Sequence, residues 1–354
     1  METLNLYGWS DFTRNRSLNP SQPDLKLGRV ISLTGLTYHL VTETNVIPAE
    51  LSGKLLYGTE PELIPQTGDW VYYMDYGENG YIIELIERRN ALWRRQPGNV
   101  TGRQVMAANV DYGLIVQGLD MDFNVMRLDR YIVQLTDCGI QPIIVLNKVD
   151  LIENREQYIS ELSRHGIRCS VYFCSTIVKT GMDELFNNAL IPGKTHILIG
   201  SSGVGKSSLL NALTGDGGLR TDTVSKSTGK GKHTTTARHL FVLSNGSLVI
   251  DTPGMREFGI ALEGDVTSKG LFPTIDELAV NCRFADCTHL TEAGCAVLQA
   301  LQNGNLDAKV YASYEKLIKE QRRFEISKED QKRLGKQFGK MIREARDYRS
   351  KYKY

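Results

Sequence analysis

The chain has 354 residues, of which 41% are hydrophobic and 23% are charged. This length suggests two or three domains, and the composition is that of an ordinary globular protein. The longest apolar runs fall far below the ~18 residues that span a bilayer, and the N-terminus lacks a basic stretch followed by an apolar one. We therefore predict a cytoplasmic protein with no membrane partner, whose six cysteines are thiols or metal ligands rather than disulfides.

Charge is distributed unevenly along the chain. Residues 305–354 hold 15 Lys and Arg against 8 Asp and Glu, a net charge of +7, whereas the remaining residues hold 27 against 33, a net charge of −6. A basic C-terminal segment on an otherwise acidic chain indicates an anionic partner. A solvated helical face is the commoner explanation of a single charge run.

Residues 28–92 are rich in β-branched and aromatic residues that are separated by short turns. The stretch GDWVYYMDYGENGYIIELIERR predicts two strands around a hairpin turn at 77–80. Several short strands in such a segment predict a small β-barrel, of either the OB-fold or the SH3-like type. The polar segment 94–104 predicts a linker, which places a first domain, with an N-terminal extension, at 1–100.

From 105 to 260, short apolar runs alternate with helical patterns, which predicts a parallel α/β sheet in a second domain at 101–268. A mainly helical third domain with a basic tail is expected at 269–354. An amphipathic helix in this tail is indicated by the apolar spacing of Leu334, Phe338, Met341, Ile342 and Ala345. The predicted strands of the second domain are 112–117, 142–147, 169–174, 196–200, 239–243 and 247–251.

The sequence GSSGVGKS at 200–207 matches the phosphate-loop pattern G-x-x-x-x-G-K-[ST]. It follows a predicted strand and opens a helical pattern, which is the context that the motif requires. Backbone N–H groups of such a loop surround the β-phosphate, while Lys206 reaches the β- and γ-phosphates and the Ser207 hydroxyl binds Mg²⁺. The predicted nucleotide-binding residues of this segment are Gly200, Ser201, Ser202, Gly203, Val204, Gly205, Lys206, Ser207 and Ser208.

A second nucleotide motif ends another predicted strand and consists of Asn147, Lys148, Val149 and Asp150. The Asp150 carboxylate can accept from the ring N–H and the exocyclic amine of guanine, a donor pair that adenine lacks, so the motif selects GTP over ATP. In isolation, a strand-end turn with an N-capping Asp is the commoner meaning of such residues, but the phosphate loop downstream favours guanine binding. A further guanine-contacting loop is expected at Ser175 and Thr176.

The sequence DTPG at 251–254 ends a further predicted strand. We expect Asp251 to hold Mg²⁺ through water and the Gly254 N–H to meet the γ-phosphate. The polar stretch VSKSTGKGKHTTTARH before it predicts a switch that becomes ordered around the nucleotide. One of the three threonines at 234–236, here assigned to Thr235, completes the Mg²⁺ coordination.

Hydrolysis requires a group that orients the attacking water, and many GTPases carry Gln after the glycine of this motif. Here the residue is Met255, which offers water no hydrogen bond, so we expect slow intrinsic hydrolysis unless another group takes over. His233 in the switch is the best candidate, and it joins Lys206 and Gly254 as a predicted catalytic residue. A histidine that is merely exposed in a loop explains the same observation, since a lone His is weak evidence.

The motifs occur in an unusual order. A Ras-like GTPase chain meets its phosphate loop first and its guanine-reading motif last, whereas here the guanine-reading motif comes first. A nucleotide site is assembled in space, and the ends of a compact domain often lie close together, so they can be joined and the chain reopened elsewhere. The sequence therefore predicts a circularly permuted P-loop GTPase domain, in which the DTPG segment leads directly into the C-terminal domain.

A cysteine–histidine cluster in a C-x4-C-x-H-x5-C pattern follows the α/β region and consists of Cys282, Cys287, His289 and Cys295. Three thiolates and one imidazole suit one tetrahedral, structural Zn²⁺, with no coordination position left for a substrate. The other cysteines lie in or beside apolar segments and are interpreted as core thiols: Cys138, Cys169 and Cys174.

The permuted order, the metal cluster and the segments AANVDYGLIVQ, NKVDL, GSSGVGKSSLLNAL, GKHTTT and DTPGMREF together resemble the ribosome small subunit-dependent GTPase (RsgA/YjeQ) family, over roughly residues 28–325. The resemblance implies an N-terminal OB-fold, a permuted GTPase domain and a C-terminal zinc domain. It also implies a factor in late maturation of the small ribosomal subunit that binds rRNA and whose GTPase activity the subunit stimulates. His233 matches the family's proposed catalytic histidine. Ala293 and Lys232 stand where the family usually has Pro and Arg, and neither change removes a ligand.

We therefore expect a monomer that converts GTP to GDP and phosphate, binds the small ribosomal subunit and its rRNA with GTP, leaves on hydrolysis, and has no DNA partner. Two alternatives are a nucleic-acid-binding module that uses the GTPase domain only as a switch, and a metabolic P-loop ATPase or kinase. The presence of Lys206, Ser207 and Asp251 argues against an inactive site, and the guanine-reading motif argues against ATP.

Overall fold

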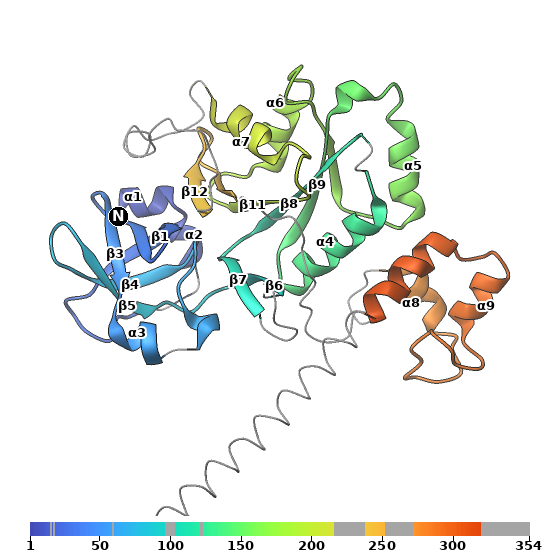
Figure 1. The fold of residues 1–354 in the computed structure, drawn as a ribbon, viewed down its shortest axis with the longest axis horizontal. Coiled ribbons are helices and arrows are strands. Elements are labelled where there is room, and N and C mark those ends of the chain that lie inside the picture. Colours follow the sequence, from blue (N-terminus) through green and yellow to red (C-terminus); the bar gives the residue numbers. More distant parts are fainter. Residues whose placement is uncertain are drawn as a thin grey trace, which may run out of the picture.

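The computed structural model describes residues 1–14, 16, 18–58, 60–95, 103–120, 123–215, 238–251 and 272–319. Within these residues the chain forms an N-terminal β-barrel, a central α/β sheet and a C-terminal helical unit (Figure 1). No described helix is both long and apolar enough to cross a membrane. Several predicted features lie outside the described residues, namely His233, Thr235, Gly254, Met255 and the apolar stripe after residue 330.

Five strands of the N-terminal region close into a barrel. Strand β1 pairs with both β2 and β4, and the pairs β2–β3, β3–β5 and β5–β4 complete the ring. This five-stranded closed barrel is the OB-fold type among the two that the sequence left open. The turn between β4 and β5 occupies 76–79, one residue earlier than predicted, because Gly80 already pairs with Asp75. The elements are β1 (Lys26–Thr34), β2 (Thr37–Val41), β3 (Val46–Leu51), α3 (Gly53–Gly58), η1 (Pro61–Leu63), β4 (Trp70–Asp75) and β5 (Gly80–Leu85).

The N-terminal extension packs against the barrel through two short helices, α1 (Glu2–Leu6) and α2 (Trp9–Phe12). The Trp9 and Phe12 rings lie 4.7 and 5.8 Å from the Trp70 ring of β4, measured between ring centroids. The fully buried Arg29 of β1 donates to the Tyr7 carbonyl and, across the interface with the central sheet, to Thr195 Oγ1 at 3.0 Å. The extension and β1 therefore hold the barrel against the first residue of β11.

The central sheet has the strand order β10-β9-β8-β11-β13-β12, and all six predicted strands form to within one residue at each end. Five of the strands are parallel, but β12 runs antiparallel to β13 because a tight turn, rather than a helix, connects the two strands. The bounds are β8 (Tyr112–Gly118), α4 (Val125–Asp137), β9 (Gln141–Asn147), η2 (Val149–Leu151), α5 (Glu156–Arg164), β10 (Ser170–Phe173), α6 (Met182–Glu184), η3 (Leu185–Ala189), β11 (Thr195–Ile199), α7 (Lys206–Thr214), β12 (Arg238–Val242) and β13 (Leu248–Asp251).

Side chains of β8 alternate between two apolar layers. Ile115 packs in the layer that holds Leu128 and Leu135 of α4, whereas the neighbouring Leu114 packs with Leu209 of α7 on the other face. A short loop connects β8 to α4, and another connects β11 to α7. The packing of the two helices on the sheet therefore fixes the position of these loops.

Strand β12 also pairs with β1 of the barrel, at Ser32 with His239 and Leu33 with Arg238. The barrel and the central sheet are consequently one continuous hydrogen-bonded surface of strands. Because β12 begins directly after the undescribed segment 216–237, which contains the predicted switch, the seam joins the end of that segment to the barrel.

The prediction of a linker at 94–104 is wrong at both of its ends. Strands β6 (Ala91–Arg95) and β7 (Arg103–Ala108) form an antiparallel ribbon in which Arg94 pairs with Gln104. The polar sequence suited a linker, but the ends of two paired strands can have the same polar composition.

The C-terminal unit is mainly helical in its described part, as predicted. It contains α8 (Pro273–Ala279), α9 (Ala296–Gln302) and a helix at 308–319. Val133 of α4 belongs to the apolar cluster of this unit, together with Tyr314 and Leu317. The unit is thus packed on α4 of the central domain.

Candidate functional site: a guanine-nucleotide pocket and a metal centre

The predicted nucleotide residues gather at one edge of the central sheet. Parallel neighbouring strands end at the same edge, and Asn147 ends β9, Gly200 follows β11, and Asp251 ends β13. The loop of Ser175 follows β10 at the far side of β9. The fold therefore brings the guanine-reading motif, the phosphate loop and the predicted Mg²⁺ ligand Asp251 together although they are distant in the chain.

Two glycines of the phosphate loop occupy positions that no other residue fits. Gly200 has φ 144°, and a Cβ there would lie 2.2 Å from the Val116 carbonyl oxygen of β8. Gly205 has φ 96°, and its Cβ would lie 2.3 Å from Asn147 Nδ2. These close approaches let the loop turn tightly from β11 into α7, whose N-terminal N–H groups favour an anion.

One hydrogen bond joins the guanine-reading motif to the phosphate loop. The buried Asn147 side chain donates from Nδ2 to the Val204 carbonyl at 2.9 Å. Lys206 donates from Nζ to the carbonyls of Gly200 and Ser201 at 2.7 and 2.6 Å. The ammonium is therefore held over the loop, where the phosphate loop's lysine contacts β- and γ-phosphates.

The guanine-reading motif is supported so that Asp150 stays accessible. Lys148 has φ 66°, and its ammonium pairs with Asp120 at 2.5 Å. The Val149 N–H donates to the Cys174 carbonyl at 3.1 Å, which ties η2 to the end of β10. Asp150 itself is exposed, so its carboxylate is available for the two guanine donors.

Ser175 is fully buried and engaged within its own loop. Its N–H donates to the Thr180 carbonyl at 2.9 Å, and its Oγ accepts from the N–H groups of Ile177 and Val178 at 3.3 Å each. These hydrogen bonds hold the conformation of the loop. The neighbouring Thr176 is only half-buried and is therefore more accessible to a base than Ser175.

The side chains of Ser207 and Asp251 are suitable ligands for Mg²⁺. Ser207 lies exposed in the first turn of α7, and Asp251 ends the adjacent strand β13. A hydroxyl and a carboxylate supply the oxygen ligands that Mg²⁺ prefers beside substrate phosphates. The predicted third ligand, Thr235, lies outside the described residues.

Two charged residues at this edge of the sheet were not predicted from the sequence motifs. Asp120 holds Lys148, and Arg127 in the first turn of α4 donates from Nη1 to Ser201 Oγ of the phosphate loop. Neither belongs to a nucleotide motif. The signal that points to them is positional, because both follow β8, which lies between β9 and β11 in the sheet.

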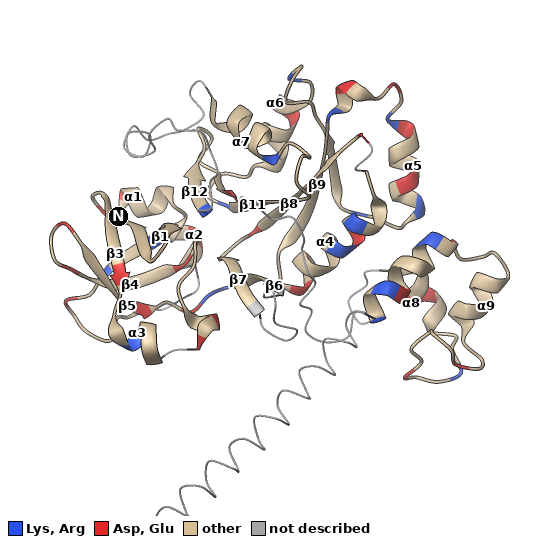
Figure 2. Ribbon diagram, viewed as in Figure 1, with Lys and Arg blue, Asp and Glu red and all other residues tan. Residues whose placement is uncertain are grey.

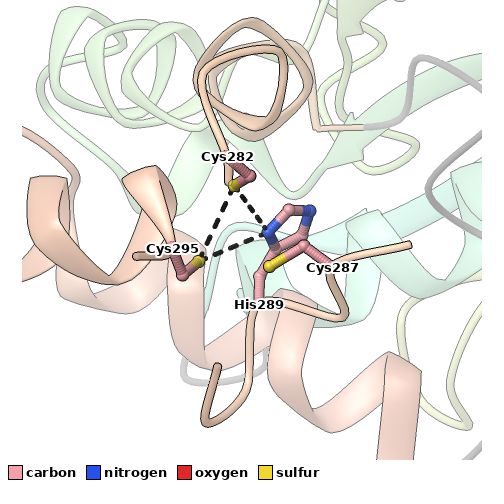
Figure 3. Close-up of side chains that lie close together, drawn as sticks. All are labelled: Cys282, Cys287, His289 and Cys295. Atoms are coloured by element: carbon pink, nitrogen blue, oxygen red, sulfur yellow. Dashed lines mark hydrogen bonds between the residues drawn. The ribbon is translucent and has the colours of Figure 1, made fainter. Parts of the chain in front are cut away.

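The four predicted zinc ligands converge in the C-terminal unit (Figure 3). All ligand atoms lie within 4.8 Å of one another. Cys282 Sγ is 3.5 Å from His289 Nδ1 and 3.9 Å from Cys295 Sγ, and Cys295 Sγ is 3.4 Å from His289 Nδ1. Tetrahedral Zn²⁺ with Zn–S bonds of about 2.3 Å and Zn–N bonds of about 2.0 Å separates its ligand atoms by about 3.5 to 3.8 Å. The residues therefore fit one zinc ion.

The surrounding chain stabilises thiolates and fixes the loop. The N–H groups of Ala296 and Leu298, at the start of α9, donate to the sulfurs of Cys282 and Cys295, each at 3.4 Å. The Glu292 carboxylate accepts from the Leu290 and Thr291 N–H groups. Negative sulfurs at a helix N-terminus are favoured electrostatically, so the centre is built for charged ligands rather than neutral core thiols.

The other three cysteines behave as core thiols. They are unbridged, and burial raises the pKa of the Cys174 thiol to about 12. Burial, assisted by the nearby Asp129 charge, raises the pKa of Cys169 to about 11. Thiols with raised pKa values are poor nucleophiles at neutral pH, and among the described residues none of these three cysteines belongs to a group of potential metal ligands.

A guanine-reading motif and a phosphate loop on one permuted sheet, with a barrel before it and a Cys₃His centre after it, define the chain as a circularly permuted GTPase. The RsgA GTPase family model matches residues 85–261. A protein named small ribosomal subunit biogenesis GTPase RsgA 1 from Bacteroides thetaiotaomicron is 40% identical over 350 residues, which cover 99% of this chain and 98% of that protein. The chain belongs to the RsgA GTPase family, and it hydrolyses GTP.

Two solved structures have the same architecture. YjeQ from Thermotoga maritima has a TM-score of 0.59 and 26% identity, with 84% of this chain and 98% of that chain covered. YloQ, described as a circularly permuted GTPase, has a TM-score of 0.57 and 28% identity, with 86% and 97% covered.

Proposed function

We propose that this chain is an assembly factor of the small ribosomal subunit, which binds the subunit and its rRNA with GTP and leaves after the subunit stimulates hydrolysis. The part of the proposal that concerns GTP is carried by the hydrogen bond from Asn147 to the Val204 carbonyl, which joins the guanine and phosphate loops into one site. A relative that covers nearly the whole chain is named for biogenesis of this subunit.

In this proposal each nucleotide residue has a defined role. Asp150 reads guanine, Asn147 holds the two loops together, and Thr176 contacts the base beside the loop that Ser175 shapes. Lys206 neutralises the β- and γ-phosphates, within the loop Gly200–Ser208. Ser207, Thr235 and Asp251 are the ligands of Mg²⁺, which when bound neutralises phosphate charge.

Hydrolysis by the isolated protein is slow, because Met255 offers no hydrogen bond to a water molecule. His233 is the residue proposed to orient that water once the subunit orders the switch, while the Gly254 N–H contacts the γ-phosphate. The zinc ion at Cys282, Cys287, His289 and Cys295 is structural. We place the domains at 1–100, 101–268 and 269–354, and the protein acts as a cytoplasmic monomer.

Co-sedimentation tests the partner directly. The full chain, loaded either with a non-hydrolysable GTP analogue or with GDP, is centrifuged with purified small subunits. The proposal expects the protein in the subunit pellet with the analogue and in the supernatant with GDP. Equal pelleting with both nucleotides, or pelleting with large subunits as well, contradicts it.

A further inference from the structure

The barrel is an unfavourable surface for nucleic-acid phosphates. Between Lys26 and Leu85 the chain holds 3 Lys and Arg against 8 Asp and Glu, and Figure 2 shows acidic residues along its strands. Phosphate binding by proteins depends on Lys and Arg. The barrel strands therefore carry few cations that could attract RNA phosphates.

A cavity of about 230 Å³ lies between α4 and the helix at 308–319. Its lining includes Arg127 and Arg130 of α4 and Lys316 of the C-terminal helix, and no carboxylate is among the described residues that line it. Figure 2 shows basic segments on both helices. We call this space the α4 cavity.

The walls of the α4 cavity are held in place by buried contacts. Ser313 Oγ donates to Asp129 Oδ2 at 3.0 Å, and both side chains are buried. Val133 of α4 packs in the same apolar cluster as Leu317. Because the two helices are joined by a core, the distance between the α4 arginines and Lys316 is set by packing.

The chemistry of the α4 cavity suits one phosphate group. Arginine presents a planar fork that matches phosphate oxygens, and lysine adds a compact positive charge. The volume is below the ~300 to 1,000 Å³ of pockets that enclose whole small ligands. The cavity also lies at the N-terminal end of the 13-residue helix α4, with Asn124 as its N-cap, where the helix dipole favours an anion.

Arg127 links the α4 cavity to the nucleotide site. Its guanidinium lines the cavity and also donates to Ser201 Oγ in the phosphate loop. A phosphate in the cavity and a nucleotide in the loop therefore act on the same side chain. Any coupling between them must be reciprocal, so that each ligand changes the affinity of the other by the same factor.

We propose that the α4 cavity binds a single phosphodiester of an rRNA backbone and that Arg127 couples its occupation to the bound nucleotide. That the RNA is rRNA rests on the proposed function. That the cavity binds phosphate, and that Arg127 links it to the nucleotide, is argued from the residues that line the cavity and from the contact of Arg127 with Ser201.

The test uses the full chain loaded with a non-hydrolysable GTP analogue, and a fluorescent oligouridylate as the probe. Affinity is measured over a series of salt concentrations for wild type, Lys316→Gln and Arg130→Gln. Lys309→Gln is the matched control, because Lys309 is an exposed lysine of the same helix that does not line the cavity. Loss of one phosphate contact lowers the slope of log affinity against log salt by about 0.7 for a single strand.

We expect the slope of log affinity against log salt to fall by this amount in Lys316→Gln and in Arg130→Gln, and to stay unchanged in Lys309→Gln. The double variant Arg130→Gln/Lys316→Gln loses about the same slope as each single variant, because one phosphate occupies the cavity. Wild-type slopes in both single variants, an equal loss in the control, or no binding of the probe by wild type overturns the proposal.

The coupling has its own readout. Arg127→Gln brings the ratio of RNA affinities between the GTP-analogue and GDP forms close to one, and Lys316→Gln, which loses the same phosphate contact, does so as well, whereas Lys309→Gln keeps the wild-type ratio. An unchanged ratio in Arg127→Gln contradicts the coupling. Failure of the proposed function is seen separately, as loss of GTP-dependent co-sedimentation by the wild-type protein, and does not alter the slopes measured with the oligonucleotide.

Discussion

In the proposed function, the choice of nucleotide depends on Asp150. Its carboxylate is exposed and is proposed to accept from two guanine donors, one of which xanthine replaces with a carbonyl. Asp150→Asn supplies an amide donor for that carbonyl, so we expect weaker GTP binding and stronger binding of xanthosine triphosphate. Titration of both nucleotides against both proteins measures this. Binding of ATP as tight as that of GTP by wild type would show that the assignment of Asp150 is wrong.

Gly205 is the position where the phosphate loop and the guanine motif approach most closely. A Cβ there meets Asn147 Nδ2 at 2.3 Å and requires a left-handed φ, so Gly205→Ala strains the backbone and displaces Asn147 from the Val204 carbonyl. Each effect costs about 1 to 2 kcal/mol. We expect GTP affinity to fall by about tenfold or more.

Gly215→Ala is the matched control for that substitution. Gly215 follows α7 directly, and a Cβ there has no atom of the described residues within 4 Å. Its GTP affinity should equal that of wild type when both are measured by calorimetry. Equal affinities of Gly205→Ala and Gly215→Ala would refute the close approach as the cause.

At the scale of elements, the seam between β12 and β1 contains the half-buried histidine His239. Burial, together with the nearby His39, lowers the pKa of His239 to about 4, and its Nε2 has no hydrogen-bond partner among the described residues. As pH falls below the usual histidine pKa of about 6.5, the unfolded chain binds a proton that the folded chain excludes until about pH 4. Stability should therefore decline across this window.

The free-energy loss at the seam is on the order of 2 kcal/mol after allowance for a partly exposed ring. His239→Gln removes the titrating group, so its melting temperature should change less than that of wild type between pH 7 and pH 5. Parallel pH dependence in the two proteins, measured by calorimetry in the same buffers, would exclude His239 as the source.

The zinc centre acts at the same scale, because it organises the C-terminal unit. Structural zinc supplies folding free energy on the order of 10 kcal/mol, so Cys287→Ser or chelation should unfold the helices after about residue 270 and spare GTP binding. Metal analysis should find one zinc ion per wild-type chain. Zinc-free protein with intact protection of α9 in hydrogen exchange would contradict this expectation.

For the whole molecule, local patterns predicted the elements better than their long-range contacts. The strands at 112–117 and 142–147 and the phosphate loop follow from apolar periodicity and fixed spacing. The pairing of His239 with Ser32, and the hydrogen bond from Arg29 to Thr195, join residues far apart in the chain and have no periodic signature.

The same reasoning explains what was missed at the site. The zinc ligands were identifiable because four soft ligands lie close together in the sequence. Arg127 was not, because its importance comes from the sheet order that places β8 beside β11. The segment 94–104 was misassigned because polar composition does not distinguish a linker from the ends of two paired strands.

The central claim is that a slow GTPase is activated by the small ribosomal subunit, and GTP turnover with and without purified subunits tests it most directly. At low salt, we expect subunits to raise the wild-type rate by about 10²-fold or more, the scale of a well-placed catalytic group. His233→Ala should retain GTP-dependent subunit binding and lose most of the stimulated rate. A wild-type rate that is the same with and without subunits would contradict the account and leave the GTPase domain as a switch for another partner.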